Sequence, residues 1–177
     1  DVDTVRGGSG ADSILGGADN DSLVGNNDDD TLDGGSGNDT LEGNAGADSL
    51  IGGLGSDYLY DTEGVNRFEG GAGNDTIYGL GGRDGGSGDD LLYYIGDDVP
   101  MTIEGGEGND SLWNWYNNRS GIFANPPVLL GGDGNDSINI SSINARMEGG
   151  EGNDTLSGSS RPDTLFGDAG NDSLTGS

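Results

Sequence analysis

The chain has 177 residues, 39 of them glycine, and its 33 acidic and six basic side chains give a formal net charge of −27. This charge excludes nucleic acid and anionic membranes as partners, because both need a basic surface, and no stretch is apolar enough for membrane insertion. The absence of histidine and cysteine excludes ordinary zinc and copper sites. The remaining metal ligands, carboxylates and backbone carbonyls, suit a hard cation.

A nine-residue pattern, GGxGxDxUx with U a large apolar residue, recurs from end to end. Without this order, a composition with 29% hydrophobic residues would be typical of a disordered chain. Clear copies begin at residues 7, 16, 34, 52 and 70, and again at 85, 105, 131, 149 and 167. Weaker copies, such as GNNDDDTLD at 25 and GNAGADSLI at 43, fill the gaps in register. Periodicity of this kind predicts a repeat fold.

Each position of the unit has a physical role. Glycines at positions 1, 2 and 4 permit the positive φ angles of a tight turn, and the aspartate at position 6 adds a carboxylate to that loop. The next three residues are predicted to form a short strand whose alternation turns position 8 to one side. Position 8 is apolar, which predicts a core made of Ile14, Leu23, Leu32, Leu41, Leu50, Leu59, Phe68 and Ile77.

The pattern resembles the calcium-binding nonapeptide of the RTX (repeats-in-toxin, haemolysin-type) family over essentially the whole chain. The expected fold is all-β, a right-handed parallel β-roll (β-solenoid), with two nonapeptides in each turn of about 18 residues and a loop at each edge. Calcium takes about 6–8 oxygen ligands, more than one loop offers. Each ion is therefore predicted to lie between two loops stacked on the same edge.

The two edges differ in their aspartates. One, here called the complete edge, offers a predicted metal ligand in every loop: Asp21, Asp39, Asp57, Asp75, Asp90, Asp110, Asp136, Asp154 and Asp172. The other, the interrupted edge, offers Asp12, Asp30, Asp48, Asp84 and Asp163, has Asn66 in one loop, and lacks the motif through 94–104, 114–130 and 140–148.

Loop glycines are predicted to supply carbonyl ligands: Gly35, Gly37, Gly53, Gly55, Gly71, Gly73, Gly106, Gly108, Gly132, Gly134, Gly150, Gly152 and Gly170. Together the two edges predict about eight to ten calcium ions.

A single array is predicted over residues 1–177, with irregular units at 79–104 and an excursion at 114–130 that contains Pro126 and Pro127. The segment GLGGRD at 79–84 lacks its strand. If it is an insertion, the edges exchange after residue 79; if it is a shortened unit, they do not. Asp1–Arg6 matches the end of a preceding unit and Gly176–Ser177 the start of another, so the array is expected to continue at both ends.

Outward-facing aromatic residues recur once per turn at position 9: Tyr60, Tyr78, Tyr93 and Trp113. They predict either a surface for glycan binding or self-association, or a cross-strand stack that stiffens the sheet, which is favoured. Trp115 and Tyr116 extend this set into a segment that is either a recognition loop or a hydrophobic patch over a defect in the roll, and the patch is favoured. Position 7 also faces outward and is mostly Ser or Thr, so ice binding is a third, lower-ranked hypothesis.

No catalytic site is predicted, and the protein is expected not to be an enzyme. Paired carboxylates arise everywhere by repetition, so their proximity does not indicate glycosidase chemistry. The resemblance implies a secreted bacterial protein, extracellular or at the cell surface and exported by a type I system, in which calcium-folded repeats serve a surface layer, adhesin stalk or filament. The alternative is a non-catalytic accessory or targeting module of a secreted protease, lipase, toxin or polysaccharide-modifying enzyme.

Overall fold

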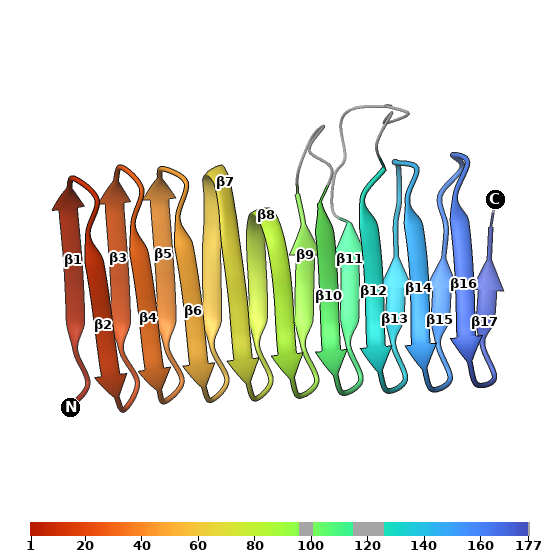
Figure 1. Ribbon diagram of the computed structural model, residues 1–177, viewed down its shortest axis with the longest axis horizontal. Helices are drawn as coiled ribbons and strands as arrows, with labels where there is room; N and C mark the ends of the chain where they lie inside the picture. Colours follow the sequence, from red (N-terminus) through yellow and green to blue (C-terminus); the bar gives the residue numbers. More distant parts are fainter. Residues whose placement is uncertain (96–100, 115–125, 177) are drawn as a thin grey trace.

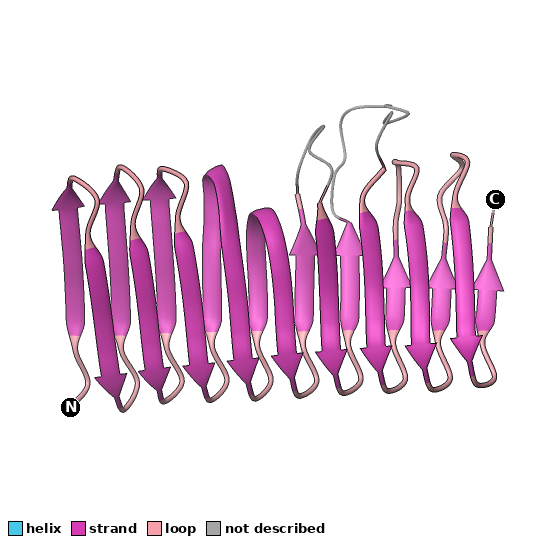
Figure 2. Cartoon of the chain, viewed as in Figure 1, coloured by secondary structure: helices cyan, strands magenta, loops and turns pink. Residues whose placement is uncertain are grey.

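A computed structural model describes residues 1–95, 101–114 and 126–176. These residues form 17 β-strands and no helix (Figure 2). No helix in this part of the chain could therefore cross a membrane. The strands follow one another in chain order along one elongated stack, with the first and last strands at opposite ends (Figure 1).

Most strands cover positions 7 to 9 of one unit and the first residues of the next. Their bounds are β1 Thr4–Ser9, β2 Ser13–Ala18, β3 Ser22–Asn27, β4 Thr31–Ser36, β5 Thr40–Ala45, β6 Ser49–Leu54, β7 Tyr58–Ala72, β8 Thr76–Ser87, β9 Leu91–Tyr94, β10 Thr102–Glu107, β11 Ser111–Asn114, β12 Val128–Asp133, β13 Ser137–Asn139, β14 Arg146–Glu151, β15 Thr155–Ser157, β16 Thr164–Ala169 and β17 Ser173–Thr175.

Strands pair in parallel with the strand one turn further along. Leu23 of β3 pairs with Leu41 of β5, and Leu32 of β4 pairs with Leu50 of β6. The intervening strand runs the other way on the opposite face of the stack (Figure 1). Two nonapeptides therefore complete one turn, and the prediction of a parallel β-solenoid is confirmed.

Strands β7 and β8 each continue from one face to the other around the interrupted edge. Within β7–β8 the pairing register shifts after Asp61, so that Asn66 pairs with Gly81. The unit that begins at Gly79 is thus shortened. The amide of Asp75 still donates to Asp90 at 2.7 Å, so both aspartates lie on one edge and the edges do not exchange. The division of the array into regular and irregular units stays a prediction, since residues 96–100 and 115–125 lie outside the described residues.

The interior is a single row of apolar side chains from each face. All eight residues predicted from position 8 are buried; Ile14 is 7% exposed, and the other seven are at most 1% exposed. Full burial of such a side chain contributes about 1.5–3 kcal/mol, but each unit supplies only one. The core is therefore thin, and the loops at the two edges must contribute to holding adjacent turns together.

Close stacking of the loops explains their glycines. A Cβ atom on Gly35 would collide with the carbonyl oxygen of Gly17 in the preceding turn, and the φ of Gly35 is 100°. Where a loop lacks this glycine, asparagine or aspartate takes the left-handed conformation, as at Asn26 and Asn44 with φ of 89° and 76°. These two residue types tolerate that conformation better than other side chains, which is why the weaker copies remain in register.

The aromatic residues at position 9 form a ladder on the outer surface of one face. The ring centroids of Tyr60 and Tyr78 lie 5.4 Å apart in stacked geometry, and those of Tyr78 and Tyr93 lie 6.0 Å apart with the rings tilted. Tyr58 extends the stack beside Tyr60 at 6.3 Å. This geometry supports a cross-strand stack, whereas a binding role stays a prediction. Trp115 and Tyr116 lie outside the described residues.

Replacing Tyr78 with serine should destabilise the folded chain. Tyr78 contacts a ring on each side, and two such contacts are worth about 1–3 kcal/mol. Trp113→Ser is the matched control, because Trp113 is 39% exposed and has no ring contact with the described residues. Thermal unfolding in calcium should show a clear drop for Tyr78→Ser and a smaller one for Trp113→Ser. Equal stability of Tyr78→Ser and the wild type would contradict the structural reading.

Candidate metal sites

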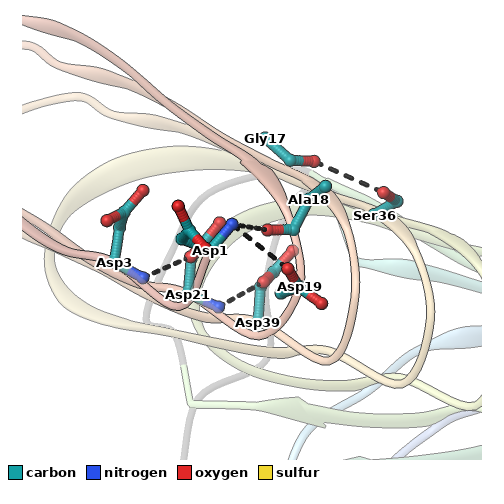
Figure 3. Close-up of polar contacts among 8 residues, drawn as sticks. All are labelled: Asp1, Asp3, Gly17, Ala18, Asp19, Asp21, Ser36 and Asp39. Carbon is teal, nitrogen blue, oxygen red and sulfur yellow. Dashed lines mark hydrogen bonds and ion pairs between the residues drawn. The ribbon is translucent and has the colours of Figure 1, made fainter.

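The aspartates of the complete edge form a continuous hydrogen-bonded ladder. The amide of Asp3 donates to Oδ1 of Asp21, and the amide of Asp21 donates to Oδ1 of Asp39, each at 2.7 Å (Figure 3). The same bond, at 2.7–3.0 Å, links each following pair of Asp39, Asp57, Asp75, Asp90, Asp110, Asp136, Asp154 and Asp172. The ladder continues through the irregular part of the array, so the structure brings all nine predicted aspartates of this edge together.

The second carboxylate oxygen in this ladder has no hydrogen-bond donor among the described residues. This holds for Oδ2 of Asp21, Asp39, Asp57, Asp75, Asp90, Asp110, Asp136 and Asp154, whose residues are at most 3% exposed. A buried, ionised oxygen without a partner is strongly unfavourable. The edge therefore requires a proton or a cation beside each of these atoms.

Carbonyl oxygens face the same small spaces. A Cβ atom on Gly16 would lie 2.6 Å from Oδ2 of Asp21 and 2.7 Å from the carbonyl oxygen of Gly34. At Gly52 the corresponding distances are 2.5 Å to Asp57 Oδ2 and 2.6 Å to the carbonyl of Gly70. A carboxylate oxygen from one loop and a carbonyl oxygen from the next thus border a space that any side chain would fill.

The glycines predicted to supply carbonyl ligands all have positive φ. At positions 2 and 4 their carbonyls face the following turn, since a Cβ on Gly53 would collide with the carbonyl of Gly35, and one on Gly55 with that of Gly37. The space between two loops is therefore lined with oxygen and lacks donors, which is the ligand set of a hard cation. The described residues contain no group of three or more acidic side chains arranged for a metal, as expected where backbone carbonyls supply most ligands.

Burial shifts the titration of these aspartates. The pKa values of Asp75 and Asp90 are raised to about 7, mainly because burial removes the carboxylates from water. The donated backbone amide opposes this rise and neighbouring carboxylates add to it. The pKa values of Asp110 and Asp136 rise to about 6 for the same main reason. Without metal, the ladder would therefore hold protons near neutral pH.

An outer ladder of asparagines, which the sequence analysis missed, runs along the same edge. The amide of Asn153 donates to Oδ1 of Asn135 at 2.9 Å, and its side-chain nitrogen donates to the same oxygen at 3.0 Å. Asn171 repeats this arrangement on Asn153. The recurrence of asparagine at position 5 was the available signal. The asparagine side chains hydrogen-bond to one another and do not donate to the buried Oδ2 atoms of the aspartates.

The interrupted edge begins with the same ladder. Asp12 donates through its amide to Oδ1 of Asp30 at 2.8 Å, and Asp30 donates to Asp48 at 2.7 Å. The amide of Asp48 then donates to Oδ1 of Asn66 at 2.8 Å. Oδ2 of each of these three aspartates is buried without a partner among the described residues.

Asp84 does not belong to this ladder, and its predicted placement in an edge loop is wrong. It pairs with Glu69 and Glu104 and lies exposed on the outer face of its sheet. The cause is the shortened unit: with no loop between Gly81 and Asp84, Arg83 falls at the core position opposite Phe68. Asp84 is consequently one step further along, at an outward position.

Side chains fill the interior of the interrupted edge where its motif is lost. Arg83 is buried, donates to the carbonyl of Gly79, and lies against the rings of Phe68 and Tyr94. Burial lowers its pKa to about 10, so it remains a cation. Tyr94, Asn114 and Ile140 occupy the position that glycine holds in regular loops and are also buried. At these described positions a buried side chain therefore takes the place of the glycine beside which the oxygen-lined space lies in regular loops.

Asp163 lies in a loop of the interrupted edge, but both of its oxygens accept hydrogen bonds. Oδ1 accepts from the amide of Ala145 at 3.0 Å, and Oδ2 accepts from the amide of Ser159 at 2.8 Å. Sequence position alone suggested a metal ligand. The structure instead gives this carboxylate the role of tying two loops together.

The geometry agrees with the comparison of the chain with known families. The chain matches the family described as RTX calcium-binding nonapeptide repeat (4 copies), over residues 1–32, 24–59, 60–92, 102–113, 128–139 and 148–177. The chain belongs to this RTX family. It is therefore a calcium-binding repeat region with a structural repeat fold, and RTX repeats are not a catalytic family. No curated protein and no solved structure matches it.

The raised pKa values predict that the metal-free RTX array is more stable in acid. The folded state binds more protons than the unfolded chain, so this stability is fully present below the ordinary pKa of aspartate and is lost as the pH rises through about 6–7. Far-UV circular dichroism of desalted protein should show more β-structure at about pH 5 than at about pH 8. A metal-free fold that gains stability as the pH rises would contradict this electrostatic account.

Asp57→Ala should remove at least one calcium ion, because Oδ2 of Asp57 is buried without a partner among the described residues and faces the carbonyl oxygen of Gly70 in the following loop. Asp163→Ala should leave the number of ions unchanged, since both of its oxygens are used by protein amides. Asp84→Ala, on the outer face, removes the same charge and is the control. Titration calorimetry measures the ion number. Equal loss in Asp57→Ala and Asp163→Ala would be evidence against the assigned ligands.

Proposed function

We propose that this RTX region binds calcium between successive loops, folds when it binds, and forms a stiff extracellular element. The observation that carries the proposal is the row of buried Oδ2 atoms on the complete edge, which lack hydrogen-bond donors among the described residues. Each faces a carbonyl oxygen of the next loop, as at Asp57 and Gly70. Bound calcium would supply the positive charge that these oxygens need.

Folding and calcium binding are expected to be one process. A formal charge of −27 gives the metal-free chain strong self-repulsion, and the core provides one apolar side chain per unit. The sites between loops exist only when the turns are stacked, so the free energy of binding contributes directly to folding. The proposed ligands remain those predicted from the sequence, without Asp84 and Asp163, with about eight to ten ions in all.

An extracellular structural role fits these requirements. Calcium modules that work outside the cell have dissociation constants of roughly 10⁻⁴–10⁻³ M. An array with such weak affinity would stay unfolded until it meets calcium at extracellular concentrations. A stack of equivalent turns is elongated (Figure 1), and its contacts join only neighbouring repeats. We therefore infer a secreted protein whose array acts as a stalk, surface layer or filament component and carries no catalysis of its own.

The second candidate is an accessory module of a secreted enzyme or toxin. The observation that favours this candidate is the exposed side chain of Trp113, in the row of aromatic residues on one face. A glycan-binding or self-associating surface would require such an exposed aromatic ring. The sequence flanking residues 1–177 separates the two: further repeats support the structural role, and an adjoining catalytic domain supports the accessory role.

Removal of calcium should unfold the chain. In chelator at neutral pH, circular dichroism should show a disordered spectrum, and millimolar calcium should restore the β-type spectrum, because the ion neutralises the buried carboxylates. Magnesium is the matched control and should substitute poorly, since it demands a compact octahedron that loosely arranged carbonyls do not provide. A chain that remains β-structured after thorough chelation at neutral pH would defeat the proposal.

A further inference from the structure

The loop at residues 61–66 departs from the motif at positions 1, 2 and 6, and two of these changes involve a carboxylate. Asp61 stands at position 1, where regular loops have glycine, and Asn66 stands at position 6, where they have aspartate. The sequence analysis took Asn66 as a break in the row of aspartate ligands on the interrupted edge. Asp61 was not considered, although an aspartate in place of the first glycine was visible in DTEGVN.

The carboxylate of Asp61 points into the space between its own loop and the preceding one. A Cβ atom on Gly43 would collide with Oδ2 of Asp61 and would lie 2.5 Å from Oδ2 of Asp48. One turn earlier, the equivalent place beside Gly25 is bordered by Oδ2 of Asp30 and, at 3.0 Å, by the carbonyl oxygen of Gly43. A carboxylate oxygen of Asp61 therefore takes the place that a backbone carbonyl oxygen holds in the regular site.

The backbone of Asp61 is turned to make this exchange. Its carbonyl oxygen faces Gly79 in the following turn, where a Cβ would collide with it. The carbonyl of Gly43, at the same position in its unit, faces Gly25 in the preceding turn. The peptide thus points away from the space, and the side chain supplies the oxygen instead.

Oδ1 of Asp61 and the side-chain amide of Asn66 have hydrogen-bond partners within the protein. Oδ1 of Asp61 accepts from the amide of Glu63 at 2.9 Å. Asn66 accepts from the amide of Asp48 at 2.8 Å through Oδ1 and donates to the carbonyl of Glu63 at 2.9 Å through Nδ2. Oδ2 of Asp48 and Oδ2 of Asp61 are buried and accept no hydrogen bond from the described residues, and the two residues are 2% and 1% exposed.

We propose that Asp48 and Asp61 together bind a divalent cation, calcium under extracellular conditions, at a site the repeat motif does not specify. Two carboxylate oxygens buried against the same space repel each other unless a positive charge lies between them. An all-oxygen ligand set selects a hard cation for that place. In this loop the carboxylate stands at position 1 instead of position 6, so one negative charge is still present at these two positions. The interrupted edge accordingly holds one site more than the motif predicts, an inference that rests on the proposed calcium function.

Four variants test this site by the number of calcium ions bound at saturation, measured by titration calorimetry. Asp61→Ala, which removes the carboxylate, should bind about one ion fewer than the wild type, and Asp61→Asn should do the same with its shape preserved. The double variant Asp61→Gly with Asn66→Asp rebuilds a consensus loop and should recover the lost ion. Asp84→Asn removes an exposed carboxylate and should leave the number unchanged.

An unchanged number of ions in Asp61→Ala and Asp61→Asn would overturn the inference, and would mean that Asp48 and Asp61 share a proton instead. Failure of the double variant to recover the ion would also count against it, because position 6 would then not be equivalent to position 1. A wild-type chain that binds no calcium would instead refute the proposed function itself. Circular dichroism at saturating calcium establishes that each variant is folded before ions are counted.

Discussion

The rest of the structure depends on how the negative charge of the buried Oδ2 atoms in the stacked aspartates is compensated. Each aspartate uses Oδ1 to accept the amide of the preceding turn, as Asp39 does for Asp21 at 2.7 Å, and this bond orients the other oxygen inward. An inward row of anionic oxygens is unfavourable in a chain of net charge −27. A cation beside each oxygen would make it favourable. In the proposed function, the feature that opposes folding without calcium is therefore the one that drives folding with calcium.

The two edges show two ways to close a turn. On the complete edge, glycine at positions 1, 2 and 4 leaves space that oxygens line, and a cation would complete it. On the interrupted edge after residue 79, Tyr94 and Ile140 fill that space, and the guanidinium of Arg83 introduces a permanent positive charge. Under the proposed function, the first solution requires calcium and the second does not. The proposal therefore makes the complete edge dependent on calcium over its whole length, and the interrupted edge dependent on it mainly before residue 79.

The nine-residue period was enough to predict the solenoid, because every copy encodes both the loop and the apolar residue that fixes its register. It predicted the aspartates of the complete edge even across the irregular spacing between Asp75 and Asp90. It failed at Asp84, because three missing residues move the chain from a loop into a strand, and repeat counting does not show which edge absorbs the loss. It also missed Asp61, whose role depends on the direction of one peptide group, which a sequence motif does not encode.

The most direct test of the account is an anomalous-scattering map of crystals grown in calcium. The account predicts peaks between successive loops along the complete edge, each bordered by a carboxylate oxygen of one loop and carbonyl oxygens of its neighbour, with none on the interrupted edge between Tyr94 and Ala145. Peaks enclosed within single loops, or confined to the outer acidic surface around Glu69 and Asp84, would contradict the central claim that the cation joins one turn to the next.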